Sequence, residues 1–352
     1  MPTLPHIVTR FPTNPIVRLA DVKPSHPDLE ILGAFNPGAT MFNDQRLLLV
    51  RVAERPIQEK GYLSTAVMDE ESGELRVLRF KLADPKLDAR DPRLIRYDGV
   101  GYVTSLSHLR TAISTDGLNF KISDTPTLTG SGRYETYGIE DARITRIEDY
   151  YYLNYTGASR SGVLTNIART KDFQTFEKLG VMFGPDNKDI AIFPEKIGGR
   201  YYTLHRPALK HLGEMTIWLA SSDNLLDWGQ HHALISPRAG YWDCERVGAG
   251  ASPIKTSEGW LELYHASDHH ICYCTGALLL DLEQPWKIIA RSETPFLYPE
   301  ASYETEGFMP NVIFHNGFIE TGDGNLELYY GGADEICCGA RVSISDILST
   351  LK

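Results

Sequence analysis

The chain has 352 residues and a formal net charge of −11 at pH 7. This acidic balance argues against nucleic acid as a partner, because a phosphate backbone is bound by basic surfaces. The sequence contains no run of 18 apolar residues and opens with no signal peptide. We therefore expect a soluble, cytoplasmic protein that does not associate with a membrane.

Residues 1–34 carry no repeat and are predicted to form an N-terminal lead-in that packs on the following domain. No linker interrupts residues 35–352, so we expect a single domain there, although the length alone would allow two. Within it a short apolar segment, a polar turn and an aromatic-rich alternating segment recur six times, about 50 to 60 residues apart. The copies are MFNDQRLLLVR (41–51), LIRYDGVGYVTSL (94–106), RITRIEDYYYLNYT (143–156), EKIGGRYYTLHRP (195–207), PIKTSEGWLELYH (253–265) and VIFHNGFIETGDGNLELYYG (312–331).

Each copy predicts a β-hairpin. In the copy at 143–156, β-branched residues precede a turn at Glu148 and Asp149, and alternating aromatic residues follow it. A second phrase with strand character trails each copy, as in TAISTDGLNF (111–120). Four strands per repeat indicate an all-β fold of the β-propeller type, whereas a plain antiparallel sandwich would not need the longer period. The consecutive residues Tyr150, Tyr151 and Tyr152 are expected to pack between blades and not to contact a ligand.

The five cysteines all lie in the last third of the chain and lack the spacing of a disulfide framework. Such a set is typical of reduced thiols in a cytosol. Cys272 and Cys274, with His269 and His270 nearby, could suggest a metal site, but a second partnered pair of ligands is missing. We therefore expect no metal.

Polar phrases interrupt the strand pattern in several repeats. Most of them lie at the start or end of a repeat's first two strands, where a propeller would gather them at one axial mouth. Turn formation and surface ion pairs would explain any single phrase. They do not explain why basic residues from several repeats should all lie beside a carboxylate from a different repeat. The phrases are FNPG (35–38) with Arg51, YGIEDAR (137–143), NKD (187–189), FPEK (193–196), LHRP (204–207), DCERVGAG (243–250), YH (264–265), PN (310–311) and YGGAD (330–334).

In these phrases the chain resembles glycoside hydrolase family 130, the inverting phosphorylases and hydrolases of β-mannosides. The resemblance covers nearly the whole chain, and within the family it is nearest to members that act on β-1,2-linked manno-oligosaccharides. It implies a five-bladed propeller, whereas the sequence shows six repeat units. Either an extra unit at 85–130 has been inserted, or one copy is an elaborated hairpin on the first blade.

The resemblance implies that Asp141 is the proton donor, acting through a mannose hydroxyl, while phosphate attacks C1 from the opposite face of the sugar. One essential carboxylate then replaces the usual pair of acid and base, because phosphate is already an anion. Asp91 lies in a similar Asp-Pro-Arg phrase and competes for this role, but the preceding Tyr-Gly and the spacing to Lys188 favour Asp141. Glu195 could serve as a general base for water in a hydrolase.

The resemblance also implies a binding set for phosphate and sugar. The phosphate-binding positions fall on Lys188, Arg206, Arg246 and His265, which all carry a suitable donor. The mannose-binding positions fall on Tyr273, Asn311 and Asp334, and Asn36, Arg51, Asp91 and Glu195 are further candidates for substrate contact. No cofactor is expected, since inorganic phosphate is a co-substrate.

We therefore predict an enzyme of the hexosyltransferase type, an inverting phosphorylase that cleaves β-linked manno-oligosaccharides with phosphate to give α-mannose 1-phosphate. The alternative on the same scaffold is an inverting β-mannosidase with water as the nucleophile. A non-catalytic sugar-binding propeller is a further alternative, which the presence of Asp141 disfavours. The expected partners are an oligosaccharide and phosphate, and the linkage, the acceptor sugar, the chain length and homo-oligomer formation stay open.

Overall fold

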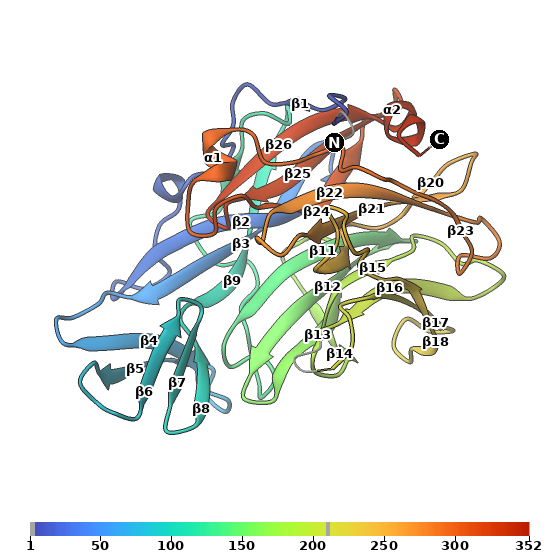
Figure 1. Ribbon diagram of the computed structural model, residues 1–352. Helices are drawn as coiled ribbons and strands as arrows, with labels where there is room; N and C mark the ends of the chain where they lie inside the picture. The colour runs from blue at the N-terminus through green and yellow to red at the C-terminus, as the bar shows by residue number, and fades with distance from the viewer. Residues whose placement is uncertain (1–3, 209–211, 352) are drawn as a thin grey trace.

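The computed structural model describes residues 4–208 and 212–351, and over these residues nearly all of the regular secondary structure is β-strand (Figure 1). Most of its strands lie in five main sheets. The first sheet contains β2 (Leu29–Phe42), β3 (Gln45–Pro56), β9 (Leu106–Ser114) and β10 (Lys121–Ile122). The second contains β11 (Ile139–Ile147), β12 (Tyr150–Ser159), β13 (Gly162–Thr170) and β14 (Glu177–Phe183).

The other three main sheets follow along the chain. The third contains β15 (Asn187–Ile192), β16 (Tyr201–Pro207), β17 (Ile217–Ser222) and β18 (Gly229–Ile235). The fourth contains β19 (Arg246–Ala249), β20 (Ile254–Lys255), β21 (Trp260–Ser267), β22 (Tyr273–Leu280) and β23 (Ile288–Arg291). The fifth contains β24 (Ile313–Glu320), β25 (Asn325–Gly332), β26 (Ile336–Ser343) and β1 (Thr9–Arg10). The helical segments are short, namely η1 (Leu19–Asp21), α1 (Ser302–Thr305) and α2 (Ile344–Ser349).

The five main sheets succeed one another around a ring of contacts. Strand β2 of the first sheet contacts β11 of the second, β12 and β13 contact β15, β16 contacts β19, and β22 contacts β24. The ring is completed by β24 and β25 of the fifth sheet, which contact β2 of the first. Because every sheet is covered by a neighbour, its inner strands contain continuous buried runs, such as Leu47–Leu48–Leu49–Val50 in β3, whereas the outer strands β14, β18 and β23 are mostly exposed or half-buried.

Two smaller sheets lie between β3 and β9. One pairs β4 (Tyr62–Met68) with β5 (Leu75–Lys81), and the other contains β6 (Leu87–Asp91), β7 (Leu94–Tyr97) and β8 (Val100–Val103). Figure 1 shows these strands set apart from the other strands at the lower left of the molecule. The repeat copy at 94–106 therefore forms β7 and β8 of a separate sheet, while the phrase that trails it joins β9 beside β3.

The N-terminal segment is part of the fifth sheet. Thr9 and Arg10 of β1 pair with Arg341 and Ala340 of β26, so the lead-in extends a sheet through backbone hydrogen bonds. Phe11 follows this strand and packs over Gly339, where a Cβ would overlap its ring. Strand β2 begins at Leu29, and the boundary expected at residue 35 therefore falls inside this strand.

The three consecutive tyrosines lie in β12, and none lines the cavity described below. Tyr151 is buried, packs against Phe42 and Phe173, and donates its hydroxyl to the carbonyl of Met41. The ring of Tyr150 lies near that of Tyr152, with centroids 6.3 Å apart. Tyr151 thus packs against the first sheet as expected, whereas the contact between Tyr150 and Tyr152 lies within β12.

Candidate active site

A cavity of about 380 Å³ lies where the five main sheets meet, which is a volume in the range of small-molecule sites. Each of the five sheets supplies part of its wall. Eight of the twelve residues predicted from the sequence line it, so segments far apart in the chain converge as expected. These eight are Asn36, Arg51, Asp141, Lys188, Arg206, Arg246, Tyr273 and Asp334.

The remaining four predicted residues lie elsewhere. His265 is buried directly behind the cavity wall and contacts Asp189, which does line the cavity. Asn311 is exposed, and its backbone carbonyl accepts a hydrogen bond from the amide of Tyr273 at 2.9 Å. Its side chain is not part of the wall, although the next residue, Val312, is.

Glu195 is exposed, forms an ion pair with Lys255 at 2.5 Å and does not line the cavity. Strand β15 carries the chain away from Lys188 by about 3.3 Å per residue, and this removes Glu195 from the centre. The expectation that Glu195 contacts substrate therefore has no support in this geometry. The short sequence separation between Glu195 and Lys188 did not reveal that the strand runs away from the cavity.

Asp91 is also exposed and pairs with Arg93 at 3.3 Å. It lies in the small sheet of β6, β7 and β8 and lines an outer hollow, not the central cavity. The two hollows share Arg93, Ile271 and Met309, so Asp91 lies on the outer side of the cavity wall. This position leaves Asp141 as the candidate for the proton donor.

Three successive sheets present a polar residue to the cavity in the same way. Asn36 in β2, Asp141 in β11 and Asp189 in β15 each lie at a register shift between the first two strands of their sheet. All three have a positive φ, of 49°, 52° and 56° respectively. A bulge of this kind turns a side chain out of the regular alternation, and bulges are enriched beside active sites.

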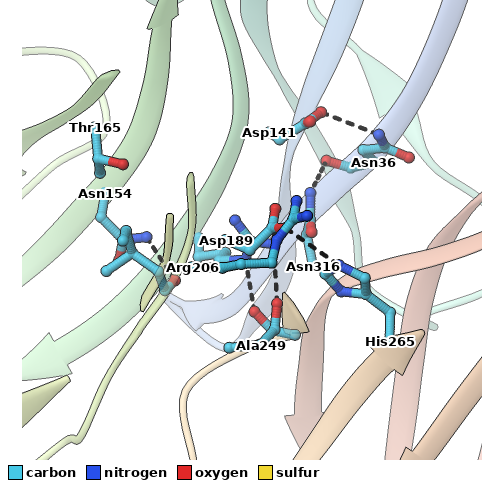
Figure 2. Close-up of polar contacts among 12 residues, drawn as sticks. Asn36, Asp141, Asn154, Thr165, Asp189, Arg206, Ala249, His265 and Asn316 are labelled. Atoms are coloured by element: carbon cyan, nitrogen blue, oxygen red, sulfur yellow. Dashed lines mark hydrogen bonds and ion pairs between the residues drawn. The ribbon is translucent and has the colours of Figure 1, made fainter. Parts of the chain in front are cut away.

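Asp141 is buried and held by two donors. Its Oδ1 accepts a hydrogen bond from Nδ2 of Asn36 at 3.0 Å, which Figure 2 shows, and another from Nη1 of Arg51 at 3.2 Å. Burial opposes ionisation, but the positive charges of Arg51 and Lys188 outweigh it, so the pKa of Asp141 lies below its ordinary value. Gly331 allows this arrangement, because a Cβ there would overlap the amide of Asn36.

Asp334 also lines the cavity, but its pKa is shifted in the opposite direction from that of Asp141. Removal from bulk water raises its pKa to about 6, against the attraction of Arg51 and with the added repulsion of Asp141. Two carboxyl groups in one cavity thus ionise in different pH ranges. Such a separation is what a site needs when one carboxyl group handles a proton and another binds substrate.

Three further basic residues line the cavity. Arg206 donates from Nε to Oδ2 of Asp189 at 2.8 Å, and its Nη2 pairs with the same oxygen. Arg246 donates from Nη1 to the hydroxyl of Tyr273 at 3.2 Å. Lys188 precedes Asp189 in β15 and also lines the cavity. Several cationic donors around one hollow provide the charge needed to hold a desolvated anion.

Asp189 and Arg143 were not assigned a role from the sequence, although both lie in the polar phrases. Arg143 donates from Nε to the carbonyl of Gly250 at 2.6 Å, and its Nη2 lies 3.3 Å from Oδ1 of Asp189. Figure 2 shows Asp189, Arg206 and His265 gathered at one point. The only available signal was the position of Asp189 directly after Lys188.

In the part of the chain that the structure describes, no cluster of three or more His, Cys, Asp or Glu side chains could hold a metal ion. Cys272 and Cys274 lie with their Sγ atoms 3.8 Å apart, and all five cysteines are free. Among residues 4–208 and 212–351, no helix is long and apolar enough to cross a membrane.

The fold and this site define a member of glycoside hydrolase family 130, to which the chain belongs. The family model, described as β-1,4-mannooligosaccharide phosphorylase, matches residues 91–352. The chain is 45% identical over 350 residues to the β-1,2-mannobiose phosphorylase of Listeria innocua, and the match covers 98% of each protein. It is 40% identical to the 1,2-β-oligomannan phosphorylase of Thermoanaerobacter sp. over 249 residues, which are 70% of this chain and 82% of the relative.

A solved structure gives the same result. The complex of the Listeria innocua β-1,2-mannobiose phosphorylase with β-1,2-mannobiose superimposes with a TM-score of 0.94 at 44% identity, covering 98% of this chain and 99% of that one. The family membership predicted from the sequence is thus confirmed.

Proposed function

We propose that this protein is an inverting phosphorylase that cleaves β-1,2-linked mannobiose or short β-1,2-manno-oligosaccharides with inorganic phosphate, releasing α-mannose 1-phosphate. The observation that carries this proposal is the meeting of Asp141 with Lys188, Arg206 and Arg246 around one cavity. The names of the relatives from Listeria innocua and Thermoanaerobacter support the linkage and the use of phosphate.

We further propose that the five main sheets are the blades of a five-bladed propeller. The proposal is supported by the ring of contacts that runs from sheet to sheet and returns from the fifth to the first. The small sheets between β3 and β9 are then an insertion in the first blade, which accounts for the sixth repeat copy.

In the proposed reaction, phosphate binds at Lys188, Arg206 and Arg246 and attacks C1 of the mannosyl unit, while the C1–O bond to the leaving sugar breaks. Asp141 supplies the proton through a mannose hydroxyl to the departing oxygen. In the free protein, Arg51 and Lys188 favour the ionised form of Asp141. A phosphate dianion beside Lys188 weakens this stabilisation and raises the pKa of Asp141, so phosphate binding favours the protonated acid.

The hydrolase alternative has weaker support. Glu195, the general base considered for water, is exposed and outside the cavity. A hydrolase would also gain nothing from three cationic side chains, whereas a phosphorylase needs them to offset the desolvation of the anion.

The test is an incubation of the protein with β-1,2-mannobiose in phosphate-free buffer and with added phosphate. We expect α-mannose 1-phosphate and mannose in equal amounts, formed only when phosphate is present, with the anomer identified by NMR. Release of mannose alone, at a rate independent of phosphate, would establish the hydrolase. β-1,4-Mannobiose in a parallel incubation tests the linkage.

A further inference from the structure

One carboxylate, that of Asp189, connects several basic groups around the cavity. Its side chain is only 1% exposed. Oδ2 accepts from Nε of Arg206 at 2.8 Å and from Nη2 of the same residue, and it lies 3.3 Å from Nε2 of His265. Oδ1 lies 3.3 Å from Nη2 of Arg143. These three partners come from β16, β21 and β11, so Asp189 ties together three of the main sheets.

This arrangement is costly for the fold. A buried charge loses its hydration, and packed apolar residues often stabilise a protein as well as buried ion pairs do. The backbone of Asp189 also lies in the left-handed region at φ +56°, which is unfavourable for a residue other than glycine. Burial opposes the charge, yet Arg206, His265 and Arg143 hold the pKa of Asp189 well below its ordinary value, so the carboxylate is ionised at neutral pH.

The contact with Asp189 determines which edge of Arg206 is available. Nε and Nη2 are taken by the carboxylate, while Nη1 contacts only the sulfur of Met215, at 3.1 Å, among the hydrogen bonds of the described residues. A thioether is a weak acceptor, so this N–H group gives up little when it turns to a better one. Arg206 and Met215 both line the cavity, which puts the Nη1 edge at its wall.

The backbone beside this cluster is shaped to permit the contact with His265. A Cβ on Gly248 in β19 would overlap the ring of His265 and lie 2.7 Å from Oδ2 of Asp189. Glycine is therefore required here for close approach and not for an unusual φ. The ring of His265 also packs on Phe314, with centroids 4.3 Å apart, so it is fixed from two sides.

We propose that Asp189 is a positioning residue of the phosphate site, which orients Arg206 for the anion and is itself held from behind by His265, without binding phosphate. This inference rests on the proposed phosphorylase function. An amide cannot replace the carboxylate, because it offers one acceptor oxygen and directs its NH₂ group at a guanidinium. Partners that orient the ligands of a metal site are worth about 10- to 100-fold in affinity or activity, and we expect an effect of this order for an oriented anion-binding arginine.

The experiment compares wild type with Asp189→Asn in steady-state phosphorolysis of β-1,2-mannobiose. We expect the KM for phosphate to rise by about 10- to 100-fold in the variant. The KM for mannobiose should stay within about twofold, because a change confined to the anion site leaves sugar binding intact. Equal effects on both KM values, or no effect on either, would overturn the positioning role.

Glu262 provides a control for replacing a buried carboxyl group by its amide. Because burial raises its pKa to about 8, it is largely protonated at neutral pH, and the control tests packing and not the loss of a charge. It is a fully buried carboxyl group in the adjacent β21, its Oε1 accepts from the amide of Gly250 at 2.8 Å, and it does not line the cavity. Glu262→Gln should leave both KM values near those of wild type. A rise in the phosphate KM of this variant equal to that of Asp189→Asn would mean that any buried carboxyl group has this effect, which would overturn the proposal.

Two further measurements separate positioning from folding. If Asp189 acts through Arg206, the Asp189→Asn effect on the phosphate KM should largely disappear in an Arg206→Ala background, and full additivity would contradict this. If Asp189→Asn does not fold, Gly248→Ala tests the same contact by pushing His265 from Asp189, with the same expected selective rise in the phosphate KM. If the wild-type protein cleaves mannobiose without phosphate, the proposed phosphorylase function is refuted. If the wild type needs phosphate but Asp189→Asn shows no selective rise in the phosphate KM, only the positioning role is refuted, so the two failures are distinguishable.

Discussion

Arg51 donates from Nη1 to Oδ1 of Asp141 over 3.2 Å. The residue proposed as the proton donor is therefore held as part of an ion pair in the free protein. The same guanidinium reaches Oε1 of Glu140 from Nη2 at 2.9 Å. One arginine thus pairs with two neighbouring carboxylates and favours the ionised form of Asp141. Binding of substrate and phosphate must weaken this electrostatic stabilisation before Asp141 can carry a proton.

Asp141→Asn should lower turnover by about 10²- to 10⁴-fold, the usual contribution of a positioned general acid. The amide is nearly isosteric, so the thermal unfolding temperature should change little. Asp91→Asn is the control, because Asp91 is exposed and lies outside the central cavity. Normal turnover in Asp141→Asn together with a loss in Asp91→Asn would reverse the assignment.

Lys188→Ala should raise the KM for phosphate strongly, because it removes a cationic donor from a desolvated site, where one donor is worth roughly 2–4 kcal/mol. Synthesis of oligosaccharide from α-mannose 1-phosphate should weaken as well, since the reverse reaction uses the same site. Initial rates in both directions provide the measurement. Lys255→Ala is a suitable control, because Lys255 pairs with Glu195 away from the cavity.

The pH dependence of kcat/KM should report Asp334, whose pKa is raised to about 6 by burial. If the ionised carboxylate accepts hydrogen bonds from the sugar, kcat/KM falls as the pH drops below about 6. The charge of Glu140 contributes to the raised pKa, so Glu140→Gln should move this acidic limb to lower pH. An unchanged limb in that variant would remove Asp334 as its source.

Glu262 should make stability depend on pH. Burial raises its pKa from 4.5 to about 8, so between these values the folded state binds a proton that the unfolded state has lost. Stability must then fall as the pH rises through this window, by at most about 1.4 kcal/mol per pH unit. Glu262→Gln should remove this part of the slope, as measured by thermal unfolding from pH 5 to 9. An identical slope in both proteins would show that the buried group is not the cause.

The sequence was informative where its pattern was local. The alternation at 143–156 predicted the hairpin of β11 and β12. The polar phrases contain seven of the eight predicted cavity residues, and the family resemblance added Tyr273. The copy at 94–106 has the same local pattern, yet it forms strands of a separate sheet whose residues are less buried than those of β3. Local alternation specifies a hairpin but not the sheet that the hairpin joins.

The direction in which a strand carries its residues and the partners of a buried charge were harder to predict from the sequence. Glu195 follows the Lys188 phrase closely, but the strand between them runs away from the cavity. The role of Asp189 depends on partners in β11, β16 and β21, and no spacing in the chain reveals that these strands meet. Such contacts are set by the packing of the sheets and not by local propensity.

The pairing of β1 with β26 also constrains how the molecule can be made. Thr9 pairs with Arg341, so the fifth sheet joins segments at opposite ends of the described chain. During synthesis, Thr9 and Arg10 leave the ribosome long before their partner strand exists, and β26 is the last of the described strands to appear. Until then the contacts between the fifth sheet and β2 are also incomplete. The central cavity can therefore be completed only after β26 has been synthesised, and a nascent chain stalled earlier would carry unpaired strand edges that favour aggregation.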